Sequence, residues 1–300
     1  MSGHGMPCPC CFPITMKLIR FGDPGKEQPG IILENGRKCN LSSFGEDYDE
    51  HFFETDGISR LAKWLGKNKE DLPLIDDDAR LGPPVCRPGK IVCIAFNYRD
   101  HARETGKEIP PEPVFFLKAP SALSGPNDDL RIPRSSNKTD WEVELAAVIN
   151  RRASYVLKEK AMDYVAGYVL FNDYSEREFQ FNRGGQFVKG KSADTFAPLG
   201  PFLATADEIR DYRKLKIWLQ VNGETMQDSN TSNLIFDLPD IISTISQYMT
   251  LTPGDIICTG TPAGVGHGKN PPQYLKPGDH IVYGIDGLGE ASQTATAWDS

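Results

Sequence analysis

The stretch TDWEVELAAVIN, residues 139–150, is the most informative part of the sequence, because it places two acids inside a strongly apolar strand. Apolar and acidic residues alternate along it, which is the two-residue period of a β-strand. The apolar face carries Trp141, Val143 and Leu145, and the opposite face carries Glu142 and Glu144. The two carboxylates are then about 7 Å apart at ~3.3 Å rise per residue. Because Ala146 and Val148 continue the acidic face, the stretch predicts two negative charges that point toward a partly apolar interior.

The rest of the chain favours a mixed β (α+β) fold. Residues 214–229 (KLKIWLQVNGETMQDS) predict a hairpin with Asn222-Gly223 at its tip, which is a strong turn signal. Helical spacing is confined to a few segments, and strands and helices do not alternate regularly, so a doubly wound sheet is disfavoured. The other expected strands lie in residues 90–96, 168–172 and 278–298, and the expected helices are residues 57–66, 98–106 and 237–251.

Composition divides the chain into three parts. Residues 1–15 contain Cys8, Cys10 and Cys11 but no regular apolar pattern, so we predict a disordered extension. Residues 16–80 alternate short apolar runs with glycine turns, which predicts a small N-terminal β-rich domain. A polar, proline-rich stretch follows, and we predict that residues 85–300 form the main domain.

Charge and hydropathy exclude two classes of partner. The chain has 33 basic and 41 acidic residues, a net charge of −8, and no basic cluster, which argues against nucleic acid. The longest apolar run, residues 164–171, has about eight residues, less than half of the ~20 that cross a bilayer, so we expect no membrane span. The seven cysteines show no disulfide pattern, and a cytoplasmic location is therefore expected.

A third acid completes a candidate metal site. Asp173 follows the buried run 169–172, at the point where a core strand emerges. Three carboxylates repel one another in a half-buried site, and a hard divalent cation reverses that repulsion. Oxygen ligands without a nearby Cys or His favour Mg²⁺ or Mn²⁺ over zinc. Spacing alone leaves an alternative, in which the acids form salt bridges with Arg151, Arg152 or Arg177.

Further polar residues are candidates for acid–base and oxyanion chemistry. His101 and Glu104 are three residues apart in one predicted helix, so they share a face. Such a carboxylate orients the imidazole as a general base for water, and a surface ion pair is the alternative. Lys189 or Lys191 could stabilise an oxyanion, or both could be solvated loop residues. Residues 260–268 (GTPAGVGHG) lack both nucleotide-binding patterns and are interpreted as a backbone loop beside a small ligand.

Taken in order, the motifs resemble the fumarylacetoacetate hydrolase family from about Lys90 to the end of the chain. They are FNYRDHARE (96–104), WEVELAAVI (141–149), GYVLFNDYSEREFQ (167–180), KGKSADTFAPLGP (189–201), VNGETMQD (221–228) and GDIICTGTPAGVG (254–266). The resemblance implies a C-terminal β-sandwich roll, a homodimer and a bound Mg²⁺ or Mn²⁺ ion.

The resemblance also implies roles for nine residues. The implied metal ligands are Glu142, Glu144 and Asp173. The implied catalytic groups, a water-activating dyad on a lid segment and a lysine that stabilises the oxyanion, are His101, Glu104 and Lys191. The implied contacts to the carboxylate and keto oxygens of the substrate are Arg177, Gln180 and Thr261.

Two positions depart from the family pattern. Ala95 occupies a position where many members have glycine, two residues before Asn97, so we expect a change in how the lid hinges. Glu176 precedes Arg177 where a small residue is usual. We expect this extra acid to bias the choice of substrate or to pair with Arg177.

The C-terminal region narrows the implied function. Residues 269–293 (KNPPQYLKPGDHIVYGIDGLGEASQ) are similar to members that hydrolyse 2,4-diketo-3-deoxy sugar acids, often labelled ureidoglycolate lyase. The resemblance implies a metal-dependent hydrolase that cleaves a C–C bond in a small 2-oxo acid, a 2,4-diketo acid of the acylpyruvate type, through a metal-bound enolate. The alternatives are an oxaloacetate decarboxylase, an isomerase or lyase of the same family, or a metal-binding homologue without catalysis.

Overall fold

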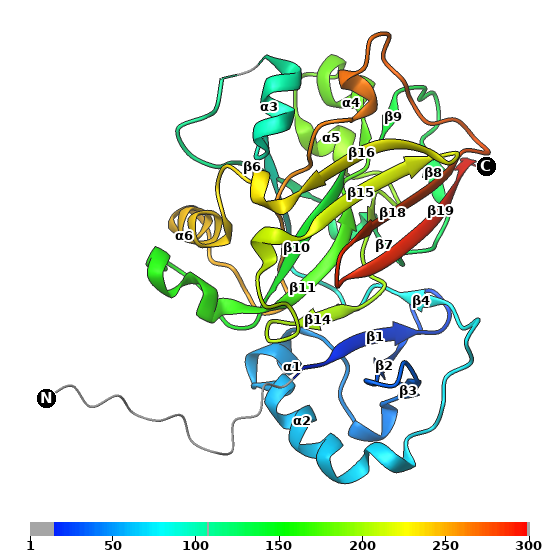
Figure 1. Ribbon diagram of the computed structural model, residues 1–300, viewed down its shortest axis with the longest axis vertical. Helices are drawn as coiled ribbons and strands as arrows, with labels where there is room; N and C mark the ends of the chain where they lie inside the picture. The colour runs from blue at the N-terminus through cyan, green and yellow to red at the C-terminus, as the bar shows by residue number, and fades with distance from the viewer. Residues whose placement is uncertain (1–14, 107, 299–300) are drawn as a thin grey trace, which may run out of the picture.

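The computed structural model describes residues 15–106 and 108–298 and has the mixed α+β architecture that the sequence predicts (Figure 1). The predicted extension, residues 1–15, lies outside the described residues except for its last position. Four cysteines are described, and all are free thiols; they are Cys39, Cys86, Cys93 and Cys258. Within residues 15–106 and 108–298, no helix is long and apolar enough to cross a membrane.

One ten-stranded sheet forms the centre of the molecule. Its order is β3-β2-β1-β14-β11-β10-β17-β5-β6, with β4 paired to β1. The strands are β1 (Lys17–Phe21), β2 (Gln28–Ile32), β3 (Lys38–Asn40), β4 (Leu81–Gly82), β5 (Ile91–Ala95), β6 (Val114–Lys118), β10 (Val143–Ile149), β11 (Val165–Asn172), β14 (Leu203–Thr205) and β17 (Ile256–Cys258).

Strand β10, which contains most of the opening stretch, lies between β11 and β17. All seven of its residues are buried, so neither face meets solvent. A strand covered on both faces carries apolar side chains at nearly every position, which explains why the acidic face becomes apolar after Glu144. The predicted interior location of this stretch is therefore confirmed.

The N-terminal part packs β1–β3 against two helices, α1 (Glu50–Glu54) and α2 (Gly57–Asn68). The sequence predicted that the second helix ends at Gly66, but it continues to Asn68 because Gly66 is tolerated on an exposed helix face. The central sheet is continuous across the expected domain boundary, since β1 pairs with β14 at Leu18↔Leu203. The division into residues 16–80 and 85–300 stays a prediction.

A second sheet lies in front of β10 and β11 in Figure 1. Its order is β16-β15-β18-β19-β8, and its strands are β8 (Leu130–Ile132), β15 (Lys216–Val221), β16 (Glu224–Asn230), β18 (His280–Ile285) and β19 (Gly289–Ala297). The predicted hairpin is confirmed, with Asn222 and Gly223 at φ of 52° and 80°, as its tight turn requires. The two sheets are joined by a hydrogen bond of 3.0 Å from the Val143 amide to Gln227 Oε1.

Short elements gather at one end of the two sheets. Figure 1 shows α3 (Arg99–Thr105), α4 (Arg177–Asn182) and α5 (Phe187–Lys191) at this end, whereas α6 (Leu238–Tyr248) lies to one side. Two short ladders pair β9 (Thr139–Asp140) with β12 (Ser175–Glu176) and β7 (Leu123–Ser124) with β13 (Ala197–Pro198). The 3₁₀ helices are η1 (Ser42–Phe44), η2 (Lys69–Asp71), η3 (Pro120–Ala122), η4 (Lys158–Tyr164), η5 (Tyr212–Lys214), η6 (Thr231–Asn233) and η7 (Gly266–Gly268).

Candidate active site

Antiparallel pairing of β10 and β11 brings three acids together. Glu142 immediately precedes β10, Glu144 lies on β10, and Asp173 immediately follows β11. The Val143↔Asn172 register places the start of one strand beside the end of the other, and the Asp173 amide donates to the Glu142 carbonyl at 2.8 Å. All three side chains are buried, and one carboxylate oxygen from each lies within 4.8 Å of the others.

Two cations bind Glu142. Lys191 Nζ donates to Glu142 Oε2 at 2.7 Å and to Asp173 Oδ2 at 2.8 Å, and Arg177 Nη2 donates to Glu142 Oε1 at 2.6 Å. Burial opposes ionisation of Glu142, but the charges of Lys191 and Arg177 overcome it and lower its pKa to about 2. Residue spacing alone allowed these acids to form salt bridges with nearby arginines. Glu142 does form such a salt bridge with Arg177. The side chains of Arg151 and Arg152 are exposed instead.

Glu144 is in the opposite situation. Its Oε2 accepts the Gly260 amide at 2.8 Å, and it forms no ion pair with any described residue. Burial, followed by the negative charges of Asp173 and Glu142, raises the pKa of Glu144 well above its usual value. A buried carboxylate with only a backbone partner is costly, so the cluster has room for one more positive charge.

The donor set fits a hard divalent cation. The three neighbouring acids supply carboxylate oxygens alone, which is the ligand chemistry that Mg²⁺ and Mn²⁺ prefer. The local charges point the same way. Four buried acids, Asp140, Glu142, Glu144 and Asp173, face three buried cations, Lys118, Lys191 and Arg177.

Lys118 is a buried cation that the sequence analysis missed. Its side chain is inaccessible to solvent, and Nζ forms an ion pair with Asp173 Oδ1 and donates to the Tyr174 carbonyl at 3.0 Å. Asp173 is thus held by a lysine on each carboxylate oxygen. The available signal was a lysine that ends the apolar run VFFLK, residues 114–118, where a buried side chain needs a partner.

Replacing Lys118 with Met is expected to lower the free energy of unfolding of the metal-free protein by about 3–5 kcal/mol, because Asp173 loses a buried partner. Added Mn²⁺ should restore part of that loss by supplying positive charge at the cluster. Chemical denaturation with chelator and with Mn²⁺ measures both effects. The control Lys189→Met removes an exposed lysine and should change stability by less than about 0.5 kcal/mol. A Lys118→Met variant as stable as the wild type would contradict this expectation.

His101 and Glu104 form a pair on α3 that faces the acids. His101 Nδ1 lies 3.0 Å from Glu104 Oε2, and Glu104 Oε1 accepts the Gly264 amide at 3.1 Å. His101 is buried, so the pair differs from a solvated surface ion pair. Glu104 is partly buried, which favours its neutral form, but the His101 and Gly264 hydrogen bonds outweigh this and lower its pKa. Gly264 has φ of 102°, a backbone conformation that brings its amide to Glu104.

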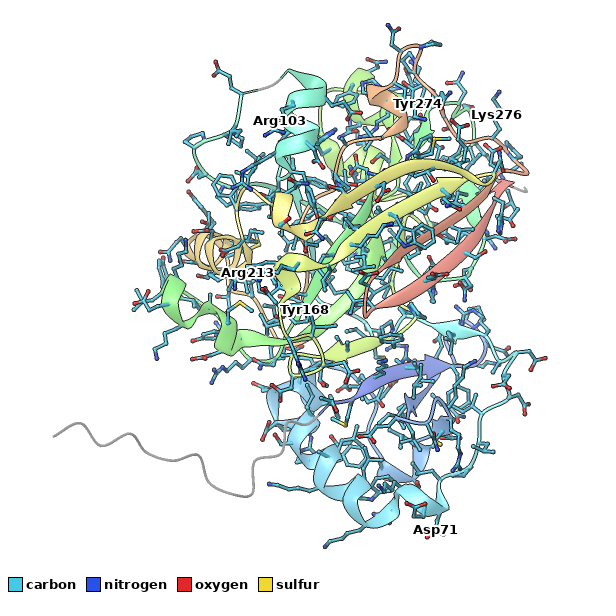
Figure 2. The ribbon with its side chains drawn as sticks, in the orientation of Figure 1. Asp71, Arg103, Tyr168, Arg213, Tyr274 and Lys276 are labelled. Atoms are coloured by element: carbon cyan, nitrogen blue, oxygen red, sulfur yellow. The ribbon has the colours of Figure 1, made fainter. Side chains whose placement is uncertain are left out.

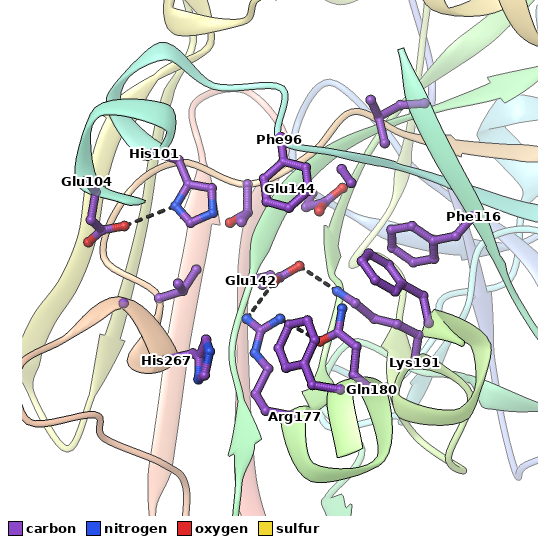
Figure 3. A pocket seen from close by; sticks show the side chains of 17 residues that line it. Phe96, His101, Glu104, Phe116, Glu142, Glu144, Arg177, Gln180, Lys191 and His267 are labelled. Carbon is purple, nitrogen blue, oxygen red and sulfur yellow. Dashed lines mark hydrogen bonds and ion pairs between the residues drawn. The ribbon is translucent and has the colours of Figure 1, made fainter. Parts of the chain in front are cut away.

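A cavity of about 330 Å³ connects these groups (Figure 3). His101 and Glu104 border one side of it, and Glu142, Glu144 and Lys191 border the other. Eight of the nine residues assigned by resemblance line this cavity, and Asp173 lies behind it, bonded to Lys191. Its polar and charged lining residues are His101, Glu104, Glu142, Glu144, Arg177, Gln180, Lys191, Thr261 and His267.

The three residues expected to contact substrate are already anchored in the protein. Arg177 donates from Nη1 to Gln180 Oε1 at 3.0 Å, which fixes the direction of the Gln180 amide. Thr261 Oγ1 donates to the Val143 carbonyl at 2.9 Å. Of the two lysines considered for the oxyanion, Lys191 lines the cavity, whereas Lys189 is exposed and donates to a backbone carbonyl at 2.7 Å.

The structure shows the surroundings of Glu176 and Ala95, the two positions that depart from the family pattern. Glu176 is buried, accepts from Thr139 Oγ1 at 2.9 Å and caps the start of α4, so it is held by these groups and not by Arg177. Arg177 Nε donates instead to Asp140 Oδ2 at 2.8 Å, a partner that the sequence analysis missed. Beside Ala95, Phe96 has φ of 55° and lines the cavity, so the altered segment directly borders the site.

The metal-free protein is expected to lose stability as the pH rises above about 5. Glu144 keeps its proton in the folded state, whereas the unfolded chain loses it near a pKa of about 4.3. The unfolded state then binds fewer protons, so the free energy of unfolding falls until folded Glu144 also ionises. Thermal unfolding with chelator between about pH 5 and about pH 9 measures the slope, which Glu144→Gln should reduce. Equal slopes for the wild type and the variant would contradict the assignment.

Comparison with known proteins places the chain in a family. Residues 90–296 match the family described as fumarylacetoacetate (FAA) hydrolase C-terminal. A relative from Burkholderia multivorans, whose name assigns it provisionally to the hydrolases, is 47% identical over 283 residues, which cover 94% of this chain and 99% of the relative.

Two solved structures extend the comparison. The maleylpyruvate hydrolase from Sphingobium sp. SYK-6, in complex with manganese(II) and pyruvate, is 31% identical with a TM-score of 0.79, and the match covers 95% of this chain and 100% of that one. The 2-hydroxyhepta-2,4-diene-1,7-dioate isomerase from Mycobacterium marinum is 30% identical with a TM-score of 0.70 and the same coverage. These matches extend over the candidate site and nearly the whole fold, and the chain belongs to the fumarylacetoacetate hydrolase family.

Proposed function

We propose that this protein hydrolyses the C3–C4 bond of a 2,4-diketo acid of the acylpyruvate type, releasing a carboxylic acid and pyruvate. The observation that supports this proposal is one cavity with a buried carboxylate cluster on one side and a histidine–carboxylate pair on the other. The similarity to the maleylpyruvate hydrolase, which was solved with manganese(II) and pyruvate, agrees with this substrate class.

The carboxylate cluster supplies the site for a cofactor in this proposal. Glu142, Glu144 and Asp173 would hold Mg²⁺ or Mn²⁺, which supplies a Lewis acid for the 2-oxo carboxylate of the substrate. Lys191 would stay beside the C2 oxygen and stabilise the negative charge that develops there. Arg177, Gln180 and Thr261 would orient the carboxylate and keto oxygens, since all three line the same cavity.

The histidine–glutamate pair carries the proton transfers. Glu104 holds His101 Nδ1, so Nε2 is the nitrogen that would take a proton from water. The water oxygen then forms a bond to C4, and the C3–C4 bond breaks with its electron pair moving toward C3 and the C2 oxygen. His101 returns the proton to C3, which completes pyruvate, and the second product leaves as the carboxylic acid.

The same groups can serve related reactions. Decarboxylation of oxaloacetate also develops charge on the C2 oxygen, and an isomerase needs proton transfer at C3 without attack by water. The similarity to the isomerase from Mycobacterium marinum supports isomerisation as an alternative function. A metal-binding homologue without catalysis is disfavoured by the presence of both His101 and Lys191 in the cavity.

Steady-state assays separate these functions. We expect the highest kcat/KM on an acylpyruvate in the presence of Mn²⁺ or Mg²⁺, and loss of turnover when a chelator removes the ion. Oxaloacetate and a 2-hydroxydienoate are the comparison substrates. A higher kcat/KM on oxaloacetate than on the acylpyruvate would indicate a decarboxylase instead of a hydrolase. Turnover that persists after chelation would show that the reaction does not need the metal.

We also propose that the protein is a cytoplasmic homodimer. Strand β6 is an edge of the large sheet, and its Val114 and Leu117 are exposed, as is typical of a surface that another subunit covers. The described cysteines are free thiols, which fits a reducing compartment. Light scattering after size exclusion should give twice the mass of the chain, and Leu117→Lys should shift the protein toward monomer.

A further inference from the structure

One wall of the cavity is a continuous row of aromatic rings. The Phe116 and Phe187 ring centroids are 5.4 Å apart, and those of Phe187 and Phe181 are 6.2 Å apart, both edge to face. Phe181 stacks on His267 with centroids 5.3 Å apart and planes 29° apart. All four residues line the cavity. Edge-to-face and stacked contacts of this kind hold the rings in fixed positions, so this wall is a preformed apolar surface.

The aromatic wall runs along the cavity between two polar ends. At one end, Lys191 Nζ lies 5.1 Å from the Phe116 ring centroid. At the other end, His267 Nδ1 lies 2.9 Å from the Tyr274 hydroxyl, and Figure 2 shows Tyr274 at the same end of the molecule as Arg103 of α3. A substrate whose 2-oxo acid end lies beside Lys191 therefore extends its acyl group along the rings.

Most polar side chains of the cavity already have protein partners, and Arg177, Gln180 and Thr261 would bind the carboxylate and keto oxygens of the substrate. Thr261 is bonded to Val143 and Gln227, and the other polar lining residues form the ion pairs and hydrogen bonds described above. His267 contacts both Tyr274 and Phe181. Hydroxyl groups on the acyl chain would lose their water without gaining well-placed partners, and each such loss weakens binding.

We propose that the acyl group of the substrate is apolar and about the size of an aromatic ring, and that it is not a polyhydroxylated sugar chain. The inference rests on the proposed hydrolysis of a 2,4-diketo acid. The cavity has room for it: at about 330 Å³ it is about twice the ~150 Å³ of an engineered apolar cavity that binds benzene. The specificity of the enzyme is then set by Phe116, Phe181 and Phe187.

A matched series of acyl groups tests this proposal with the wild-type enzyme and Mn²⁺. From acetylpyruvate through propanoylpyruvate to butanoylpyruvate, kcat/KM should rise roughly 4-fold per methylene, the equivalent of ~0.8 kcal/mol. Benzoylpyruvate should exceed acetylpyruvate by about 10-fold or more. The dihydroxylated counterpart of propanoylpyruvate, a 2,4-diketo-3-deoxy hexonate, should be cleaved at least about 10-fold less efficiently than propanoylpyruvate.

Binding of compounds that cannot be cleaved separates this inference from the proposed function. In calorimetry with Mn²⁺ present, 4-phenyl-2-oxobutanoate should bind about 10-fold or more tightly than 2-oxobutanoate, because only the first reaches the aromatic wall. This comparison holds whether or not any 2,4-diketo acid is hydrolysed. If no diketo acid is cleaved, the proposed function is wrong, and the ratio of the two dissociation constants still decides the inference.

A pair of variants assigns the preference to the wall. Phe181 and Val188 are both 43% exposed, but only Phe181 lines the cavity. Phe181→Ser should reduce the ratio of kcat/KM for benzoylpyruvate to that for acetylpyruvate by at least about 5-fold, whereas Val188→Ser should leave the ratio unchanged. Equal binding of the phenyl and methyl compounds, or a preference for the dihydroxylated substrate, would overturn the proposal.

Discussion

Replacing Glu144 with Gln is expected to abolish turnover and, at the same time, to stabilise the metal-free protein. The amide removes one of the three carboxylates, so kcat/KM should fall by more than the 10–100-fold that is typical when only a group supporting a metal ligand is lost. Without metal, Glu144 is a buried acid beside two others and forms no ion pair among the described residues. Its neutral isostere should therefore raise the free energy of unfolding at pH 7 by at least ~1.4 kcal/mol, the equivalent of one pH unit.

Glu142 provides a matched control, because we expect its substitution to change the stability of the metal-free protein in the opposite direction. Glu142→Gln also removes a carboxylate of the cluster, but Glu142 is bonded to Lys191 and Arg177. Breaking these buried pairs should cost about 3–5 kcal/mol. We would measure stability by denaturation with chelator, Mn²⁺ binding by calorimetric titration, and turnover as kcat/KM. Two variants that both destabilise the metal-free protein, or a Glu144→Gln enzyme that binds Mn²⁺ as tightly as the wild type, would contradict this account of the site.

Replacing His101 with Asn is expected to lower kcat by about 10²–10⁴-fold while metal binding stays intact, because the variant loses only the group that takes the proton from water. Glu104→Gln should have a smaller effect in the same direction, since the ring keeps its nitrogen and loses only its charged partner at 3.0 Å. Calorimetric titration with Mn²⁺ distinguishes these two variants, which should still bind the ion, from Glu142→Gln and Glu144→Gln, which should not. The control His51→Asn changes an exposed histidine on α1 and should leave kcat unchanged.

Local sequence patterns were sufficient for much of the fold. The alternation in residues 139–150, the turn at Asn222-Gly223 and the helical spacing of residues 98–106 each depend on neighbours within a few positions, and the structure has the corresponding elements. The predicted helix end at Gly66 was wrong, because a pattern within a few positions does not show how strongly the rest of the helix is stabilised. A single glycine on an exposed helix face costs only about 1 kcal/mol, which the rest of the helix compensates.

Residue spacing alone was enough to place Glu142 and Glu144 two positions apart at the start of a buried strand, and His101 and Glu104 on one face of a helix. How Glu142 and Glu144 are charged follows from the three-dimensional fold, because the pKa of each depends on groups far away in the chain. The ion pair of Asp173 with Lys118 joins residues 55 positions apart, and that of Glu142 with Lys191 joins residues 49 positions apart. No periodicity encodes such distances, and the same holds for the aromatic wall, whose rings come from β6, α4, α5 and η7.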